Sequence, residues 1–223
     1  MASEVDICNL ALGYLGDDAT VASIDPPEGS AQAEHCSRFY PIARDMMLQA
    51  HTWSFSMRRV TGALLTSESS VWEYAYALPG DCLRVLAVIP PDATDDITYL
   101  PLDSQQLPIG WYVPGAGAYT SQPFTIELNS SGAQMIYTNL ENAIIRYQAR
   151  VTDTTRFSPM LVNAIAAQLA SMIAGPLIKG KEGTTASLQW FKVAMQYLEQ
   201  AKGSDANQQH KDITHVVSWI SGR

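Results

Sequence analysis

The residues with most potential for chemistry are three acidic side chains, Asp92, Asp95 and Asp96, which follow a Pro-Pro turn. Paired carboxylates can act as acid and base in hydrolysis, or bind a hard cation. Aromatic residues that could stack on a sugar or peptide follow in the Pro- and Gly-rich segment 101–123: Trp111, Tyr112 and Tyr119. These groups favour, as one alternative, a small hydrolase or carbohydrate-binding module. Neighbouring carboxylates in a turn are, however, far more often solvated than catalytic.

The remaining candidate groups lack the spacing that catalysis or metal binding requires. The four histidines do not have metal-ligand spacing: His35, His51, His210 and His215. Cys8, Cys36 and Cys82 are too few and too scattered for a disulfide framework or a zinc ribbon. No serine sits in a GxSxG elbow, and no GxxxxGK[ST] phosphate loop is present. The sequence therefore predicts no catalytic, cofactor-binding or metal site, and a protein that is not an enzyme.

Composition narrows the class of protein further. The 223 residues are 47% hydrophobic, enough for a substantial core, and carry a net charge of −8. This charge argues against a surface that grips nucleic acid, although DNA could pass such a surface without binding. No uninterrupted apolar run of eighteen residues and no signal peptide are evident, so we expect no membrane association. A reducing cytoplasm is the simplest setting for the cysteines.

Helical periodicity occurs at both ends of the chain, near 3–16, 30–51, 158–174 and 184–202. The second segment places apolar residues on one face: Cys36, Tyr40, Ala43, Met47 and Ala50. Phe39 and Met46 widen this stripe, so one of its edges could face a neighbouring subunit. Pro41 predicts a kink or a break, and Trp53 and Phe55 predict an extended exit. In the last segment Leu188, Phe191, Met195 and Leu198 form one apolar face after a flexible linker.

The middle of the chain changes character, because turn residues crowd in and helical periodicity disappears. Strands are predicted at Trp72–Ala77, Leu83–Ile89, Ile97–Leu100, Phe124–Leu128, Gln134–Tyr137 and Ala143–Arg150. The predicted class is α+β, a helical bundle of about four helices with a β-rich insertion between the N- and C-terminal helices and an extended C-terminal tail. The expected parts are 1–55 with 151–203 for the bundle, 56–150 for the insertion, and 204–223 for the tail.

The predicted tail consists of a polar linker, 204–212, followed by a short apolar cluster. The cluster contains Ile213, Val216, Val217, Trp219 and Ile220. A chain terminus normally frays unless something holds it in place. The cluster therefore predicts a segment that docks on a partner; the alternative is a last helix that packs on its own domain.

Several motifs in the same order resemble the head–tail adaptor proteins of tailed bacteriophages, also called tail tubular protein A. The first predicted helix carries N-x-A-L-x-x-L-G, the connector ends in E-G-S, and the second helix ends in H-x-W-x-F. The segments YALPGDCLRVLAV and IRYQARVTD-x-x-x-FSPMLVNAIA are also similar to that family, so the resemblance covers most of residues 7–175.

The resemblance implies a homo-oligomeric ring, usually of twelve copies, between the capsid portal protein and the tail nozzle or tail tube protein. A C-terminal extension would bind the portal protein, so the portal would be the partner of the apolar cluster at 213–220. Trp111, Tyr112 and Tyr119 would then be tail-facing or lie between subunits. DNA would pass through the lumen during ejection without specific binding, and the acidic balance fits such a conduit. The protein would belong to the virion, at the head–tail junction, after assembly in the host cytoplasm. A neck or tail-completion protein that never contacts the portal is a close alternative.

Overall fold

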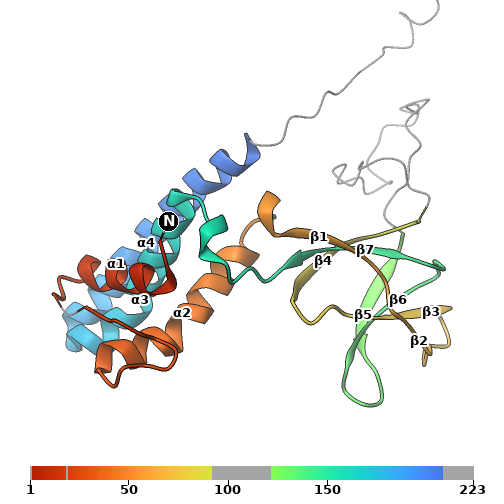
Figure 1. Cartoon of the computed structure of the whole chain (residues 1–223), viewed down its shortest axis with the longest axis horizontal. Coiled ribbons are helices and arrows are strands. Elements are labelled where there is room, and N and C mark those ends of the chain that lie inside the picture. The colour runs from red at the N-terminus through yellow and green to blue at the C-terminus, as the bar shows by residue number, and fades with distance from the viewer. Residues whose placement is uncertain (1, 19, 92–121, 208–223) are drawn as a thin grey trace, which may run out of the picture. The chain divides into compact units, whose positions relative to one another are not determined.

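The chain forms two compact units in a computed structural model that describes residues 2–18, 20–91 and 122–207 (Figure 1). The helical unit comprises residues 1–55 and 152–223, and the β unit comprises residues 56–151. Within the described ranges the chain has four α-helices and two antiparallel sheets. The predicted α+β class, with about four helices and the strands between them in sequence, is confirmed.

The first two helices begin at serine N-caps. In α1 (Glu4–Tyr14) the hydroxyl of Ser3 accepts a hydrogen bond from the Asp6 amide at 3.1 Å, and the Asp6 carboxylate accepts one from the Ser3 amide at 2.8 Å. The backbone and side-chain hydrogen bonds with Ser3 lower the pKa of the Asp6 carboxyl. The Ser30 hydroxyl caps α2 (Ala31–Gln49) in the same way. Such caps satisfy amides that have no partner inside the helix.

Pro41 lies inside α2, yet the helix is continuous, so of the two predicted outcomes, a kink or a break, the break is wrong. Proline removes only one backbone hydrogen bond, and here its ring is exposed to solvent. Burial along the opposite side, at three- and four-residue steps, holds both halves of the helix in place: Cys36, Tyr40, Ala43 and Met47. This confirms the predicted stripe except at Ala50, which is the exposed C-cap.

The two later helices form a hairpin with almost no connection. α3 (Pro159–Ile178) begins after the N-cap Ser158, as predicted, but it continues through Gly175 and Pro176. α4 (Gly180–Ala206) starts two residues later, so the predicted flexible linker is wrong. Lys179, with φ 61°, and Gly180, with φ 64°, reverse the chain in the left-handed region, where glycine has no steric cost.

α3 is the central helix of this unit and packs against α1, α2 and α4. It is long and apolar enough to cross a membrane by length and composition alone, the single such helix among the described residues. However, 61% of its apolar window is buried by the other helices. The core helix of a globular unit has the same composition, so this finding is weak evidence for a membrane span.

The β unit contains a three-stranded sheet in the order β1-β7-β4 and a four-stranded sheet in the order β2-β3-β6-β5, both antiparallel. The strands are β1 (Met57–Thr61), β2 (Leu64–Leu65), β3 (Tyr74–Ala77), β4 (Cys82–Ile89), β5 (Phe124–Leu128), β6 (Gln134–Thr138) and β7 (Ile144–Ala149). Five predicted strands are confirmed with small shifts at their ends, β1 and β2 were not predicted, and Ile97–Leu100 lies outside the described residues.

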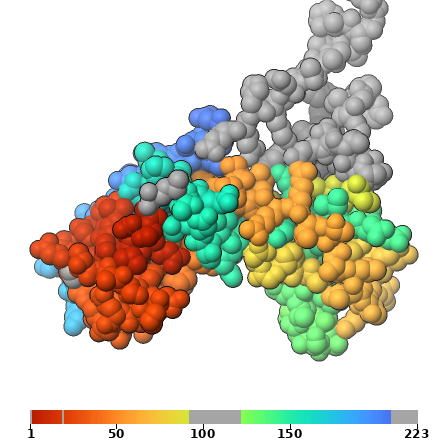
Figure 2. Space-filling model, in the orientation of Figure 1, coloured from red at the N-terminus to blue at the C-terminus, as the bar shows by residue number. Residues whose placement is uncertain are grey.

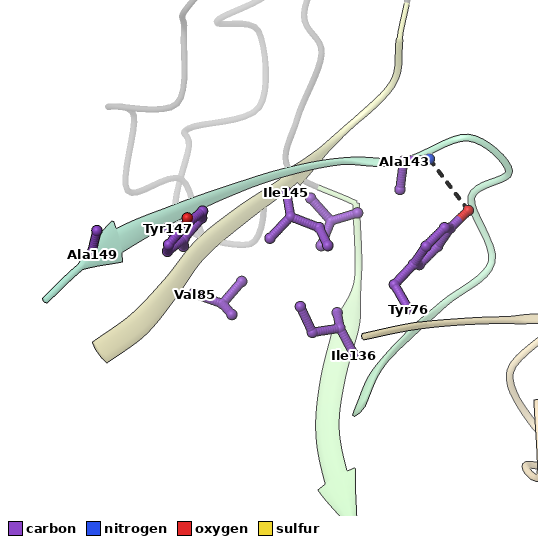
Figure 3. Packing of buried hydrophobic residues seen from close by; sticks show 8 residues of the cluster. Tyr76, Val85, Ile136, Ala143, Ile145, Tyr147 and Ala149 are labelled. Carbon is purple, nitrogen blue, oxygen red and sulfur yellow. Dashed lines mark hydrogen bonds between the residues drawn. The ribbon is translucent and has the colours of Figure 1, made fainter. Parts of the chain in front are cut away.

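Buried side chains from both sheets form the core of the β unit (Figure 3). Tyr76 from β3 connects this core to the turn before β7, because its hydroxyl donates to the Leu140 carbonyl at 2.8 Å and accepts from the Ala143 amide at 3.3 Å. Its ring lies against Gly62, where an added Cβ would come within 2.5 Å of the ring. Glycine at this position therefore allows the close approach.

Replacing Gly183 by leucine should destabilise the helical unit, because a Cβ there lies 3.0 Å from the Ala174 carbonyl oxygen and a larger side chain has no room. We expect the free energy of unfolding to fall by about 1–3 kcal/mol, measured by urea denaturation with circular dichroism. The matched control is G203L in the same helix, where an added Cβ meets nothing within 4 Å. The control should raise stability by up to about 1 kcal/mol, since glycine disfavours helices. Equal effects of the two substitutions would contradict the close packing.

Candidate assembly surfaces

The residues singled out from the sequence as sites lie outside the described residues. This holds for the acidic group, the aromatic loop and the C-terminal cluster: Asp92, Asp95, Asp96, Trp111, Tyr112, Tyr119, Ile213, Val216, Val217, Trp219 and Ile220. Their predicted roles stay predictions. The functional surfaces considered next come from the described part of the helical unit.

No group of three or more His, Cys, Asp or Glu residues within the described ranges is placed to hold a metal ion. The half-buried Cys82 is not activated as a nucleophile, since burial and the nearby Asp81 raise the pKa of its thiol to about 11. A thiol with such a pKa is protonated at neutral pH and reacts slowly. His35 stacks loosely on Phe39, with ring centroids 6.4 Å apart. These side chains offer no catalytic arrangement.

α4 presents an apolar face to solvent. Leu188 is 61% exposed and Phe191 is 44% exposed, while Met195, one turn further, is half-buried. Of the apolar face predicted from Leu188, Phe191, Met195 and Leu198, only Leu198 is buried. The side of α4 that contacts α3 carries mostly small residues: Gly183, Ala194 and Ala201. Small residues let the two helices approach closely, and the larger side chains are left on the outside.

α2 presents a second apolar face with the same spacing. Ile42 is 49% exposed and Met46 is 43% exposed, and the half-buried Phe39 lies three residues before Ile42. The positions 39, 42 and 46 match 188, 191 and 195 of α4, so each stripe runs along about two turns of its helix. This fits the expectation that one edge of the α2 stripe faces away from the core.

The two exposed faces belong to different sides of the helical unit. α2 and α4 each pack against α3 and have little contact with one another. In Figure 2 residues of α1 and α2, red to orange, cover the near face of this unit, and most of α4, blue, lies behind them. The unit thus has two separate apolar surfaces, each of which could contact another molecule.

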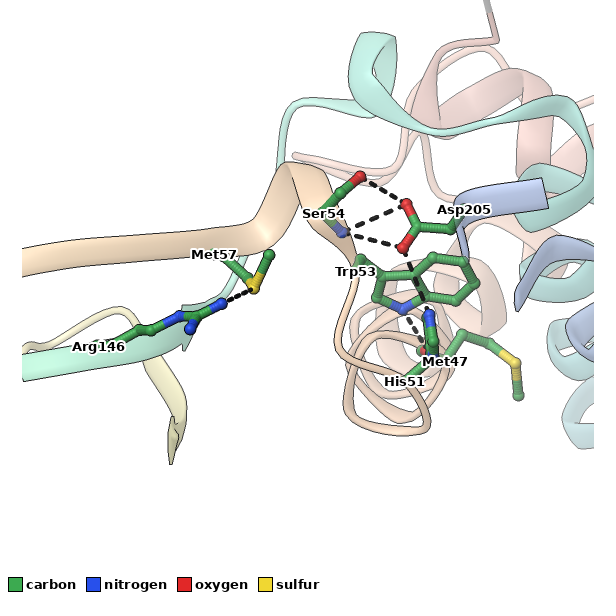
Figure 4. A network of polar contacts seen from close by, with 7 residues as sticks. All are labelled: Met47, His51, Trp53, Ser54, Met57, Arg146 and Asp205. Carbon is green, nitrogen blue, oxygen red and sulfur yellow. Dashed lines mark hydrogen bonds and ion pairs between the residues drawn. The ribbon is translucent and has the colours of Figure 1, made fainter. Parts of the chain in front are cut away.

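The end of α4 is held by a buried carboxylate (Figure 4). Asp205, 6% exposed, accepts hydrogen bonds from the Ser54 amide at 3.1 Å and from the Ser54 hydroxyl at 2.6 Å. His51 Nε2 lies 3.3 Å from the same carboxylate. The buried Trp53 completes the corner, because its indole N–H donates to the Met47 carbonyl at 3.1 Å. We call this group, His51, Ser54 and Asp205, the clasp.

Sequence reasoning missed the clasp. Residues 204–212 were predicted to be a loose linker, but α4 continues to Ala206. Trp53 and Phe55 were predicted to lie in an extended segment, but a 3₁₀ turn spans Ser54–Ser56. One signal was available in α4, since Leu198, Ala201 and Asp205 follow a three- and four-residue spacing that continues the buried side of the helix.

No protein-family model matches the sequence, and a search of curated proteins finds no match either. The resemblance of residues 7–175 to phage head–tail adaptors therefore stays a prediction, and a function has to be argued from the chain's own residues.

Replacing Asp205 by alanine should destabilise the helical unit, because the Ser54 amide and hydroxyl lose their acceptor. We expect the free energy of unfolding to fall by about 1.5–3 kcal/mol, the range for hydrogen bonds to a charged group. D205N keeps one carbonyl oxygen as an acceptor, so its free energy of unfolding should fall less than that of D205A. The matched control is E199A, an exposed acid in the same helix whose carboxylate binds only the nearby Lys202 in the described structure. Urea denaturation compares the three variants; a D205A loss no larger than that of E199A would contradict the clasp.

Proposed function

We propose that this chain is a structural virion protein of a tailed bacteriophage, a head–tail adaptor that forms a ring between portal and tail. The observation that supports this best is the pair of apolar faces on α2 and α4. A subunit in a closed ring needs two different surfaces, one for each neighbour, because head-to-tail contacts generate rings when the rotation closes. The face on α4 of one copy would pack on the face on α2 of the next.

The energetics favour a ring over a stable pair. Burying a large apolar side chain fully contributes about 1.5–3 kcal/mol, and these side chains are already about half-buried, so each adds less. Association costs roughly 4–15 kcal/mol in lost freedom, so a single contact of this kind is weak. In a ring every subunit contacts a neighbour on both sides. The contact that closes the ring joins two ends of the same assembly, so it forms at a high effective concentration. Assembly would therefore be cooperative, and a partner ring would promote it.

The C-terminal segment supplies the proposed contact with the portal. Ile213, Val216, Val217, Trp219 and Ile220 would dock there, and the β unit would face the tail nozzle or tail tube protein. The clasp fixes the start of this segment on the subunit, since Asp205 lies two residues before the last described residue, Asn207. The net charge of −8 suits a conduit through which DNA passes without specific binding. The protein would be at the head–tail junction of the virion, after assembly in the host cytoplasm.

The head-to-tail contact can be tested with two variants that each lose one face. I42R/M46R should block the α2 face and L188R/F191R the α4 face, because arginine side chains would have to be desolvated in the contact. Neither variant should self-associate, but at protein concentrations high enough to populate one weak contact a mixture should form a one-to-one complex through the two intact faces and stop there, measured by sedimentation equilibrium. Q189R/Q196R on the exposed surface of α4 is the charge-matched control and should assemble as the intact chain does. Absence of the one-to-one complex would contradict the pairing.

The adaptor role can be tested by electron microscopy of the purified protein with and without portal rings. The intact chain should form rings that cap the portal. A chain that ends at Asn207 keeps α4 and the clasp, so it should stay folded by circular dichroism and no longer join the portal. A chain that ends at Gly203 also loses Asp205 and should be less stable. Comparing the two truncated chains separates the effect of the clasp on stability from the docking of the C-terminal segment on the portal. Truncated protein that caps portals at full occupancy would overturn the docking role, and intact protein that never caps them would overturn the adaptor proposal.

A further inference from the structure

A cavity of about 150 Å³ lies in the helical unit beside the clasp. Its lining combines three aromatic side chains with a carboxylate and a rim arginine: Trp53, Phe55, Phe157, Ser158, Asp205 and Arg156. The aromatic rings form one row, with centroids 6.0 Å apart from Trp53 to Phe55 and 5.8 Å apart from Phe55 to Phe157. The aromatic side of the cavity could receive an apolar side chain, while Asp205, Ser158 and Arg156 leave its other side polar.

The described chain ends two residues after Asp205, which lines this cavity. The last described residue, Asn207, lies in the turn that follows α4. Sixteen residues, 208–223, come next, and the first large apolar one is Ile213. Six residues can span at most about 20 Å, which is enough to turn back to a site beside Asp205. No other apolar cluster of this chain outside the described residues begins so close to the cavity in sequence.

One basic side chain at the rim, Arg156, could pair with an acid of the same segment. Arg156 is exposed, and its Nε lies 3.4 Å from the Asp153 carboxylate at the start of a short 3₁₀ turn. Asp212 immediately precedes Ile213 in the sequence. With Ile213 in the cavity, the Asp212 carboxylate would come to the rim where the guanidinium is exposed to solvent. Such an exposed pair adds little affinity but favours one direction of entry.

We propose that, before assembly, this cavity receives the C-terminal segment of its own chain, with Ile213 as the first side chain to enter. The segment that later joins a partner would thus be covered on its own subunit, which keeps its apolar residues from non-specific association. The contact is small, so it would be weak enough to exchange when a larger partner surface is offered. This inference rests on the proposed docking role of the C-terminal segment, but not on the identity of the partner.

Disulfide trapping in the intact chain tests the proposal without any partner. In a C82S background, the pair R156C/T214C places one thiol at the rim and one beside Ile213. The matched control is E199C/T214C, because Glu199 is exposed on α4 about 9 Å along the helix from Asp205. A segment that moves freely would reach both sites at similar rates. Mild oxidation with oxidised glutathione at low protein concentration should trap R156C/T214C at least about tenfold faster, as expected from a raised effective concentration.

Two outcomes would overturn the proposal. Equal trapping rates for the two pairs would mean that the segment has no preference for the cavity, and predominantly intermolecular disulfides would mean that another copy's segment fills it. Adding I213S/V216S to the R156C/T214C pair should lower the trapping rate to that of the control, because the apolar side chains supply the attraction. Since no portal is present, failure here leaves the ring and portal predictions to be decided by their own measurements.

Discussion

The close packing of α4 on α3 is the constraint on which the rest of the helical unit depends. Gly183 lies against the backbone of α3, and Ala194 and Ala201 are further small residues on the buried side of α4. Where two helices approach closely, large side chains cannot lie between them. Leu188 and Phe191 are therefore placed on the outside, although their types would suit a core. An exposed apolar face on α4 is a consequence of small residues on its other side.

Because α4 packs closely along α3, its C-terminal end reaches the segment after α2 that contains Ser54. A helix of 27 residues spans about 40 Å. Its last turn is buried there, and the Asp205 carboxylate binds Ser54, 151 positions away in the sequence. The N-terminal and C-terminal parts of the unit are joined at this corner by polar contacts as well as by apolar packing.

The sequence predicts the elements better than it predicts their contacts. The helix starts predicted near residues 3, 30 and 158 are correct, because capping is a local interaction. Pro176 misleads, since α3 is supported by three neighbouring helices and continues past it. β1 was missed because most of its side chains are exposed, so apolar alternation is absent. Periodicity found the stripe from Leu188 to Leu198 but could not show which side α3 would cover, and the clasp joins residues too far apart for any local pattern to reveal.

The position of Asp205 explains why the clasp has to be specific. A carboxylate in the last turn of a helix lies near the negative end of the helix dipole, which costs roughly 0.3–1 kcal/mol. Two hydrogen bonds from Ser54 and the contact with His51 offset this cost. Without these partners, a carboxylate at this end of the helix would be unfavourable. The clasp also favours the helical conformation of the last turn of α4. A helical residue advances about 1.5 Å and an extended one about 3.4 Å, so unwinding one turn would lengthen the reach by about 7 Å. The buried carboxylate thus holds the last turn of α4 on the corner that follows α2.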